Sequence, residues 1–172
     1  LTFIDREVGW DLLKEKVKKP LYGIKAAPYY GCTLHRPAEV GLEPFGSYKL
    51  MTHFLEAIGA EPVSFDAAAV CCGSYQVLGN PEAAAMSASR VITSAADAGA
   101  ELIVSSCPLC EHNLGSQQAG LAEAGKISEQ VPTLYFTQLL ALALGLDKDT
   151  CGLELNTEQA VDFLKQKNLV AA

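Results

Sequence analysis

Five of the six cysteines in this 172-residue sequence follow a pattern that suits metal or redox chemistry. Cys32 stands alone, Cys71 and Cys72 are adjacent, and Cys107 and Cys110 form a Cys-x-x-Cys pair. Thiolates are the ligands that zinc and iron–sulfur clusters prefer, and they are also the nucleophiles of disulfide exchange. A secreted disulfide scaffold is disfavoured, because such scaffolds are shorter and richer in loops than this chain.

Each motif adds a constraint on that chemistry. A Cys-x-x-Cys pair at the start of a helix lets both sulfurs face one metal, but by itself it suits zinc and a redox dithiol equally well. The side chains of adjacent cysteines diverge on a strand, so Cys71 and Cys72 reach one cofactor only from a turn, which Gly73 permits. Five thiolates exceed the four that a tetrahedral zinc ion or a cubane cluster requires. The set therefore indicates a cluster of unusual shape or one with a spare ligand.

The segments that must position these cysteines alternate between helical and strand patterns. Apolar spacing, capping residues and breakers predict helices over 5–19, 48–58, 81–98, 109–124, 137–145 and 157–167. Apolar runs predict strands over 25–30, 62–65, 101–105 and 133–136. Ser47 and Asn80 are the expected N-caps of the second and third helices, and Gly59 is expected just after the second.

This alternation predicts an α/β fold, with a mainly parallel sheet covered by helices on both faces. Ligands of such sheets lie outside the carboxyl ends of the strands. Three of the predicted strands end shortly before a cysteine or a cysteine pair. We therefore expect Cys32, Cys71, Cys72, Cys107 and Cys110 to converge on one edge of one sheet.

Charge and hydropathy exclude several classes of function. The net charge of −7 argues against nucleic-acid binding, which needs a clustered excess of Lys and Arg. The one basic cluster, residues 14–19, is expected to be a solvated helix face. No run of about eighteen apolar residues occurs, so no membrane span is expected. Cysteine usage of this kind is typical of a cytoplasmic protein.

Several residues near or outside the motifs have two interpretations. His35 could be a ligand or a proton donor to a leaving thiolate, but a loop histidine bonded to backbone is favoured. Arg36 could attract an anionic substrate or form an ordinary surface salt bridge. His112 is a minority candidate for a group beside the ligands or the substrate, and His53 is expected to be buried in its helix. Cys151 is expected to be a free thiol in a loop.

Two groups could tune a bound cofactor. Tyr29 and Tyr30 precede Cys32 and, on a strand, are expected to alternate between the core and the edge of the site. The amides of residues 73–75 could donate hydrogen bonds to cluster sulfide, which tunes a reduction potential.

Four stretches together carry a resemblance to a known family: Tyr29-Tyr30-Gly31-Cys32, Cys71-Cys72-Gly73, Cys107-Pro108-Leu109-Cys110 with Asn113-Leu114, and residues 131–140. They resemble the cysteine-rich CCG domain, which occurs twice in one of the subunits of heterodisulfide reductase. Similar domains occur in iron–sulfur subunits of glycolate oxidase, lactate-utilisation proteins and succinate or fumarate-type reductases.

The resemblance implies a non-cubane 4Fe–4S cluster held by Cys32, Cys71, Cys72, Cys107 and Cys110. It implies an oxidoreductase subunit that acts on sulfur groups, as in reduction of the CoM-S-S-CoB heterodisulfide. Its partners would be the other reductase subunits, one a cluster-bearing ferredoxin-like protein and the other a flavoprotein.

The resemblance also implies an organisation for the chain. Residues 1–24 would be a leader joining two repeats and residues 25–172 the second, C-terminal repeat, so the chain alone would be incomplete. The alternatives are an electron-transfer module of a glycolate or lactate oxidase or succinate dehydrogenase-type complex, and a structural zinc domain, since zinc can occupy such thiolate sites.

Overall fold

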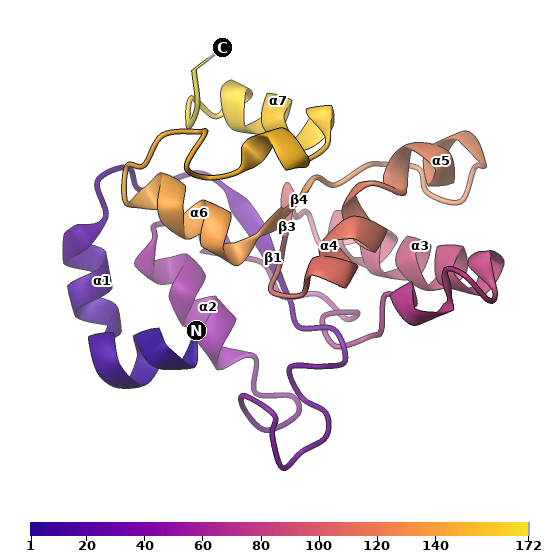
Figure 1. Ribbon diagram of the computed structural model, residues 1–172, viewed down its shortest axis with the longest axis horizontal. Helices are drawn as coiled ribbons and strands as arrows, with labels where there is room; N and C mark the ends of the chain where they lie inside the picture. The colour runs from indigo at the N-terminus through magenta and orange to yellow at the C-terminus, as the bar shows by residue number, and fades with distance from the viewer. Residues whose placement is uncertain (172) are drawn as a thin grey trace.

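A four-stranded parallel sheet runs through the middle of the computed structural model, which describes residues 1–171 (Figure 1). Its strands, in the spatial order β2-β1-β3-β4, are β1 (Lys25–Tyr29), β2 (Glu61–Pro62), β3 (Leu102–Ser105) and β4 (Thr133–Tyr135). In the register Ala27 lies beside Ile103, and Ile103 beside Thr133. The predicted α/β class with a parallel sheet is confirmed.

Helices cover both faces of this sheet (Figure 1). One face carries α1 (Trp10–Lys16), α2 (Lys49–Ala57), α6 (Phe136–Ala143) and α7 (Glu158–Gln166), and the other carries α3 (Pro81–Asp97), α4 (Pro108–Gly115) and α5 (Gln118–Glu123). Three short turns, η1 (Ile4–Val8), η2 (Ser74–Gln76) and η3 (Leu153–Leu155), complete the described elements. Within residues 1–171, no helix has the length and apolar character needed to cross a membrane.

Side chains of the central strands alternate between two hydrophobic cores. Leu102 and Val104 of β3 lie in the core under α2 and α6, whereas Ile103 lies in the core under α3 and α4. Tyr29 belongs to the second core and Tyr30 to the first, so the two tyrosines lie on opposite faces, but both are buried in a core and the expected division between core and site edge is not found. Because both faces are buried, β3 is apolar at successive positions and not only at alternate ones.

The predicted helix over 5–19 is wrong in extent, because Gly9 interrupts it. Gly9 has φ 83° and ψ 144°, which lies outside the helical region and separates η1 from α1. Helix α1 then ends at Lys16, before Pro20, and Leu13 anchors it in the first core. The lysines of the basic cluster are mostly exposed, in agreement with a solvated face.

Two other predicted elements are shorter than expected. The strand predicted over 62–65 is limited to Glu61–Pro62, and the Val63 N–H makes the last of its backbone bonds to β1, to the Ala26 carbonyl at 2.8 Å. The helix predicted over 109–124 is split into α4 and α5. The break is held by Gln118, whose side-chain amide donates to the carbonyls of Leu114 and Val131 and accepts from the Val131 N–H.

The expected caps have mixed outcomes. Asn80 caps α3 by accepting a hydrogen bond from the Ala83 N–H, and Gly59 follows α2 with φ 86°, so both predictions are confirmed. Ser47 does not cap α2. The carboxylate of Glu43 reaches across the loop instead and accepts from the N–H groups of Lys49 and Leu50, at 2.8 and 3.1 Å.

The strand order creates a switch point between β1 and β3. β1 leads into α2 on one face of the sheet, whereas β3 leads into α4 on the other face. The two outgoing chains therefore separate at the carboxyl ends of neighbouring strands, which is where open α/β sheets bind ligands.

The Glu43 cap yields a prediction with a pH dependence. Burial alone would raise the pKa of Glu43, but hydrogen bonds from Ser47, Tyr30 and the two amides outweigh it and lower the pKa. Because its pKa is lowered in the folded chain, the ionised carboxylate stabilises the fold at pH values above the ordinary glutamate pKa of roughly 4.3. This stabilisation is lost as the pH falls through the lower pKa of the folded chain. Glu43→Ala should therefore reduce the free energy of unfolding by about 1 to 2 kcal/mol at neutral pH.

Urea denaturation at neutral pH and again near pH 3, which is about one unit below the ordinary value, checks this expectation. The matched control is Glu39→Ala, which removes an exposed glutamate of the same loop. A deficit of Glu43→Ala that is equal at both pH values would contradict the capping role of the carboxylate.

Candidate metal centre

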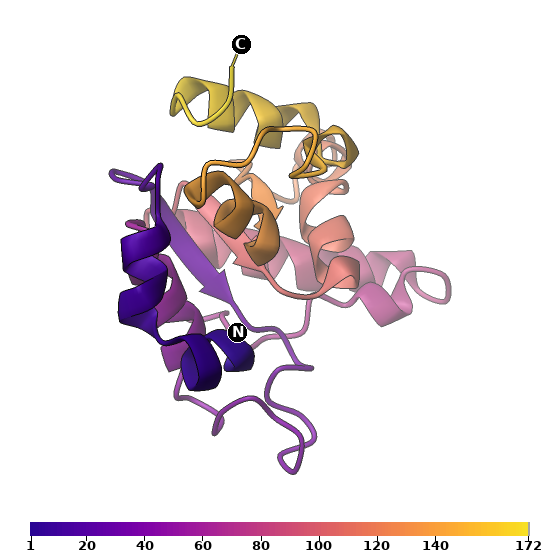
Figure 2. The same cartoon turned by 60° about the vertical axis from the view of Figure 1, so that its left-hand side comes forward.

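Two of the three cysteine segments lie at the switch point, at the carboxyl ends of β1 and β3. Cys32 follows β1 by three residues, and Cys107 follows β3 and is the N-cap residue of α4. β1 and β3 are hydrogen-bonded neighbours, so both segments leave the same edge of the sheet. The loop that follows β1 extends beyond that strand's arrowhead (Figure 2).

The third segment, residues 65–72, is tied to the end of β1. The N–H groups of Tyr30 and Gly31 both donate to the Ala68 carbonyl, at 2.8 and 3.0 Å. The Tyr29 hydroxyl donates to the Val70 carbonyl at 2.7 Å. These bonds bring Cys71 and Cys72 to the switch point. The preceding strand, β2, does not, because it lies at the edge of the sheet and ends nine residues before Cys71.

Helix α4 and helix α3 fix the cysteine pair from the other side. The buried Asn113 side chain donates to the Cys72 carbonyl at 2.6 Å. Gly73 has φ +81°, and a methyl group there would approach Ser87 Cβ to 2.8 Å and Ala84 Cα to 3.0 Å. The close approach explains why glycine follows the cysteine pair.

The sulfurs of the five motif cysteines occupy this edge with different degrees of burial. Cys72 Sγ and Cys110 Sγ lie 3.3 Å apart, and both residues are buried. Cys32, Cys71 and Cys107 are half-buried. The Gly73 N–H donates to Cys71 Sγ at 3.4 Å, and the predicted hydrogen bonds from residues 73–75 to cluster sulfide stay a prediction. All six cysteines are free thiols.

Neighbouring thiols influence the pKa values of one another. The hydrogen bond between Cys72 and Cys110 lowers the pKa of Cys72 and raises the pKa of Cys110. Cys107 raises the pKa of Cys110 further. Burial, followed by the neighbouring Cys71 thiol, raises the pKa of Cys32. The pKa effects therefore link the five thiols into one series of neighbours.

The donor set consists of five cysteine thiols from three segments. Within residues 1–171, no three His, Cys, Asp or Glu side chains form a ready-made site for a metal ion. Five soft thiolates from three segments are the ligand type that iron–sulfur clusters use. The residues present thus suit an iron–sulfur group, with Cys32, Cys71, Cys72, Cys107 and Cys110 as the available ligands.

His35 is a buried loop histidine, as favoured from the sequence. Its Nδ1 lies 3.2 Å from the Glu43 carbonyl, and its ring stacks on Tyr30 with centroids 4.9 Å apart. Its Nε2 is buried and has no hydrogen-bond partner among the described residues.

Arg36 is exposed and lies over the Phe45 ring, 5.7 Å from its centroid, and no salt bridge of Arg36 is found in residues 1–171.

The remaining sequence candidates lie apart from the sulfur ligands. His112 is exposed on α4. The expected burial of His53 is wrong: the residue is exposed on α2, with its ring edge-on to Trp10, because the buried face of α2 is formed by other positions such as Met51 and Phe54. Cys151 is a free thiol outside the regular elements, as expected, and it is buried.

Sequence reasoning missed a polar network that holds α4 from the C-terminal side. Gln138 accepts from the Tyr135 N–H and donates to Asn156, and Asn156 in turn donates to the Glu111 carboxylate. Burial raises the pKa of Glu111. The spacing of Tyr135 and Gln138 is that of a helix capping box, but nothing in the sequence signals the bonds that join Gln138 to Asn156 and Asn156 to Glu111. Asn113 did stand out in the motif, but its role as donor to Cys72 was not foreseen.

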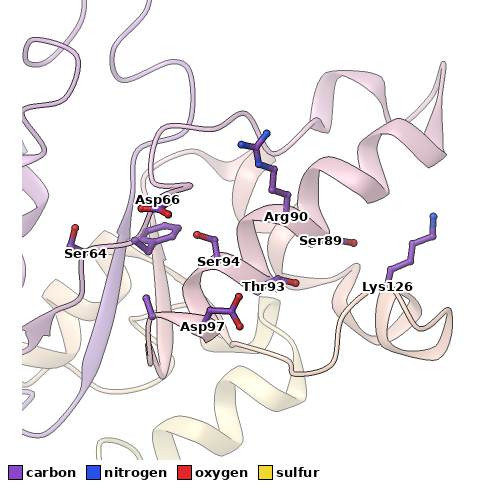
Figure 3. A pocket seen from close by; sticks show the side chains of 10 residues that line it. Ser64, Asp66, Ser89, Arg90, Thr93, Ser94, Asp97 and Lys126 are labelled. Carbon is purple, nitrogen blue, oxygen red and sulfur yellow. The ribbon is translucent and has the colours of Figure 1, made fainter.

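A polar groove lies on the face covered by α3, away from the sulfurs (Figure 3). It has a volume of about 600 Å³ and is lined by residues 64–66, by one side of α3 and by Lys126. Asp66, Asp97, Arg90 and Lys126 give it charges of both signs, and its described lining contains no cysteine. The groove therefore has no evident link to the thiol chemistry.

Comparison with known proteins identifies the family. The family model of the CCG cysteine-rich domain matches residues 26–115, a range that contains all five motif cysteines. The chain belongs to this family of cysteine-rich CCG domains.

Named relatives come from two kinds of reductase. The 8-methylmenaquinol:fumarate reductase membrane anchor subunit of Wolinella succinogenes is 36% identical over 149 residues, covering 86% of this chain and 52% of the relative. A ferredoxin:CoB-CoM heterodisulfide reductase subunit of Methanosarcina mazei is 30% identical over 167 residues, covering 95% and 55%. A protein of Archaeoglobus profundus, named for its likeness to the same heterodisulfide reductase subunit, is 31% identical over 150 residues, covering 84% and 50%. The chain thus spans about half the length of these relatives.

A solved structure supports the fold alone. A crystal structure of a hypothetical protein from Helicobacter pylori superposes with a TM-score of 0.62 at 14% sequence identity, covering 86% of this chain and 27% of that chain.

The close packing of Gly73 predicts a selective loss of stability. Gly73→Ala would combine an unfavourable left-handed backbone with a clash against α3, so we expect a loss of at least about 1 to 2 kcal/mol. Gly79→Ala is the matched control, because a methyl group there meets nothing within 4 Å and the backbone has no positive φ. Thermal or urea denaturation measures both, and equal stability of the two variants would refute the packing argument.

The Asn113 bond predicts a second, independent effect. Asn113→Asp keeps the shape of the side chain but replaces the donor with an acceptor, which leaves the buried Cys72 carbonyl unpaired. A loss of about 1 to 3 kcal/mol is expected in urea denaturation. His112→Asn, at the exposed neighbouring position of α4, should stay within about 0.5 kcal/mol of the parent chain. A stable Asn113→Asp variant would show that this bond does not hold the cysteine pair.

Proposed function

We propose that this chain is an iron–sulfur module of a reductase complex, in which Cys32, Cys71, Cys72, Cys107 and Cys110 hold one non-cubane 4Fe–4S centre. One observation carries the proposal. The switch point of the sheet gathers three cysteine segments, with Cys72 and Cys110 in contact at 3.3 Å. A fifth thiolate is more than a cubane needs, which supports the non-cubane form.

The chain's own residues would supply ligation, burial and hydrogen bonds. When bound, an iron–sulfur centre supplies one-electron transfer. Cys72 and Cys110 are buried and would hold the centre on the protein side, while the half-buried Cys32, Cys71 and Cys107 would hold it nearer to the surface. The Gly73 N–H donates to Cys71 Sγ and would add a hydrogen bond to that ligand.

We favour disulfide reduction or the reverse thiol oxidation as the process that the centre serves. Breaking one disulfide takes two electrons and two protons and releases two thiols. A single one-electron centre is insufficient for that, and this chain spans about half the length of its relatives. The chain, with residues 25–172 as the CCG domain and 1–24 as the segment leading into it, is therefore proposed to need the rest of a longer polypeptide for turnover.

The proposed partners are the other subunits of such a complex, one of them a cluster-bearing protein and the other a flavoprotein. Large apolar side chains are exposed in the segments next to the cysteines, namely Val40, Phe45, Tyr75, Leu78 and Leu109. A partner subunit that docks beside the proposed centre would cover these side chains. The relatives are themselves named as subunits, which supports the same interpretation.

A second candidate is an electron-transfer module without a disulfide substrate. The 36% identity to the fumarate reductase subunit of Wolinella succinogenes favours it specifically. The ligand set would be the same, and only the electron acceptor would differ. A structural zinc domain is the third candidate, because thiolates bind zinc readily.

Anaerobic reconstitution with iron and sulfide, followed by metal analysis and EPR, tests the proposed centre. The parent chain and Cys151→Ser should both bind iron and give the same EPR signal, because Cys151 lies outside the motif. Cys72→Ser should bind far less iron, because it removes a buried ligand. One zinc per chain, with no iron after reconstitution, would defeat the proposal. Turnover of a small disulfide by the iron-loaded chain alone would defeat the requirement for a longer polypeptide.

A further inference from the structure

The peptide bond before Cys107 is held at both ends by side chains of two neighbouring strands. The Tyr135 hydroxyl, at the end of β4, donates to the Ser106 carbonyl at 2.5 Å. The Ser105 hydroxyl, at the end of β3, accepts from the Cys107 N–H at 3.2 Å. Tyr135 and Ser105 are direct partners in the strand register, and both side chains bond to the turn that follows β3. The plane of the Ser106–Cys107 peptide is therefore fixed from two strands.

The rest of the Cys107 backbone is fixed as well. Its carbonyl accepts from the Ser105 hydroxyl at 3.1 Å and from the Glu111 N–H at 2.9 Å. A residue before proline is confined to extended conformations, and Cys107, which precedes Pro108, has φ −118° and ψ 123°. Among the bonds named here, the one from Tyr135 alone comes from another strand, 29 positions along the sequence. Tyr135 thus provides the tertiary contact in an otherwise local arrangement.

We infer that Tyr135 is a positioning residue for Cys107, which acts through the Ser106 carbonyl and sets the direction of that ligand toward the proposed centre. The inference rests on the proposed iron–sulfur function. Cys107 is half-buried, so packing restrains its sulfur less than it restrains the buried Cys72 and Cys110. A tilt of the peptide plane would carry the Cα–Cβ bond of Cys107 with it and move Sγ. A fixed plane leaves the sulfur only the rotation about that bond.

The size of the effect follows from what such groups contribute in metal sites. Removing a group that orients a ligand without touching the metal commonly weakens metal binding by roughly 10- to 100-fold. Tyr135→Phe removes only the hydroxyl and keeps the ring, which lies beside Phe136 with centroids 5.4 Å apart. The Ser106 carbonyl then loses its donor, and the peptide before Cys107 gains freedom. We expect the iron-loaded variant to lose iron to a chelator about tenfold faster than the parent chain, without oxygen.

Lys167→Met is the matched control, because it removes a side-chain contact at the other end of the same strand. Lys167 donates to the carboxylate of Glu101, the residue before β3, at 2.7 Å. Both variants lose side-chain hydrogen bonding and should unfold at lower urea concentrations than the parent chain. Lys167→Met should nevertheless release iron at the parent rate. An unchanged rate in Tyr135→Phe, or equal acceleration in both variants, would overturn the inference.

A second comparison separates positioning from a general loss of stability. In a Cys107→Ala chain the ligand that Tyr135 orients is absent, and the other four motif cysteines remain to bind iron. Tyr135→Phe should then accelerate iron release no further, although it should still lower the stability toward urea. A further acceleration in that background would show that Tyr135 acts on the centre by another route, which would contradict the inference.

Ser105→Ala keeps the inference testable if Tyr135→Phe does not fold or Cys107→Ala takes up no iron. It removes the other side-chain bond to the same peptide, so faster iron release and a changed EPR signal of the centre are expected. A parent-like rate and signal would show that the orientation of this peptide does not affect the centre, and would overturn the inference. A parent chain that takes up no iron would instead refute the proposed function, so the two failures are distinguishable.

Discussion

The candidate site is held together by hydrogen bonds to three backbone carbonyls at every second position of one segment, those of Ala68, Val70 and Cys72. Ala68 accepts from the backbone at the end of β1, Val70 accepts from the Tyr29 hydroxyl, and Cys72 accepts from Asn113 on α4. The bonds to Val70 and Cys72 each cross 41 positions of sequence. The segment that carries the cysteine pair has no regular structure of its own, so these long-range bonds determine where its sulfurs lie.

The sheet makes this arrangement possible through its topology. With β1 and β3 side by side and their outgoing helices on opposite faces, a gap forms at their carboxyl ends into which residues 65–72 fit. Buried apolar side chains on both faces make the two strands rigid, whereas the groups around the gap are polar or contain sulfur. Fold and site therefore depend on the same few residues, and a change at Asn113 or Gly73 would affect both.

The sequence was informative where local chemistry decides the structure. Asn80 with Pro81 and the apolar run 102–104 specify a helix start and a buried strand directly. The strand order accounts for Cys32 and Cys107, which follow neighbouring strands, but not for Cys71 and Cys72, whose position depends on bonds to Ala68, Val70 and Cys72. Prediction was wrong where a loop conformation or a tertiary contact decides: Glu43 replaces Ser47 as the cap of α2 from six residues away, and Gln118 divides a helix by bonding to Val131. Periodicity does not contain such contacts, because each joins segments that meet only in the folded chain.

The ligand assignment is the central claim, and the mass of the loaded chain tests it most directly. Native mass spectrometry after anaerobic reconstitution should show the chain with one added 4Fe–4S unit, and the same increment in Cys151→Ser but not in Cys72→Ser. An increment that persists in Cys72→Ser, or a mass that corresponds to a single zinc ion in the parent chain, would contradict the account.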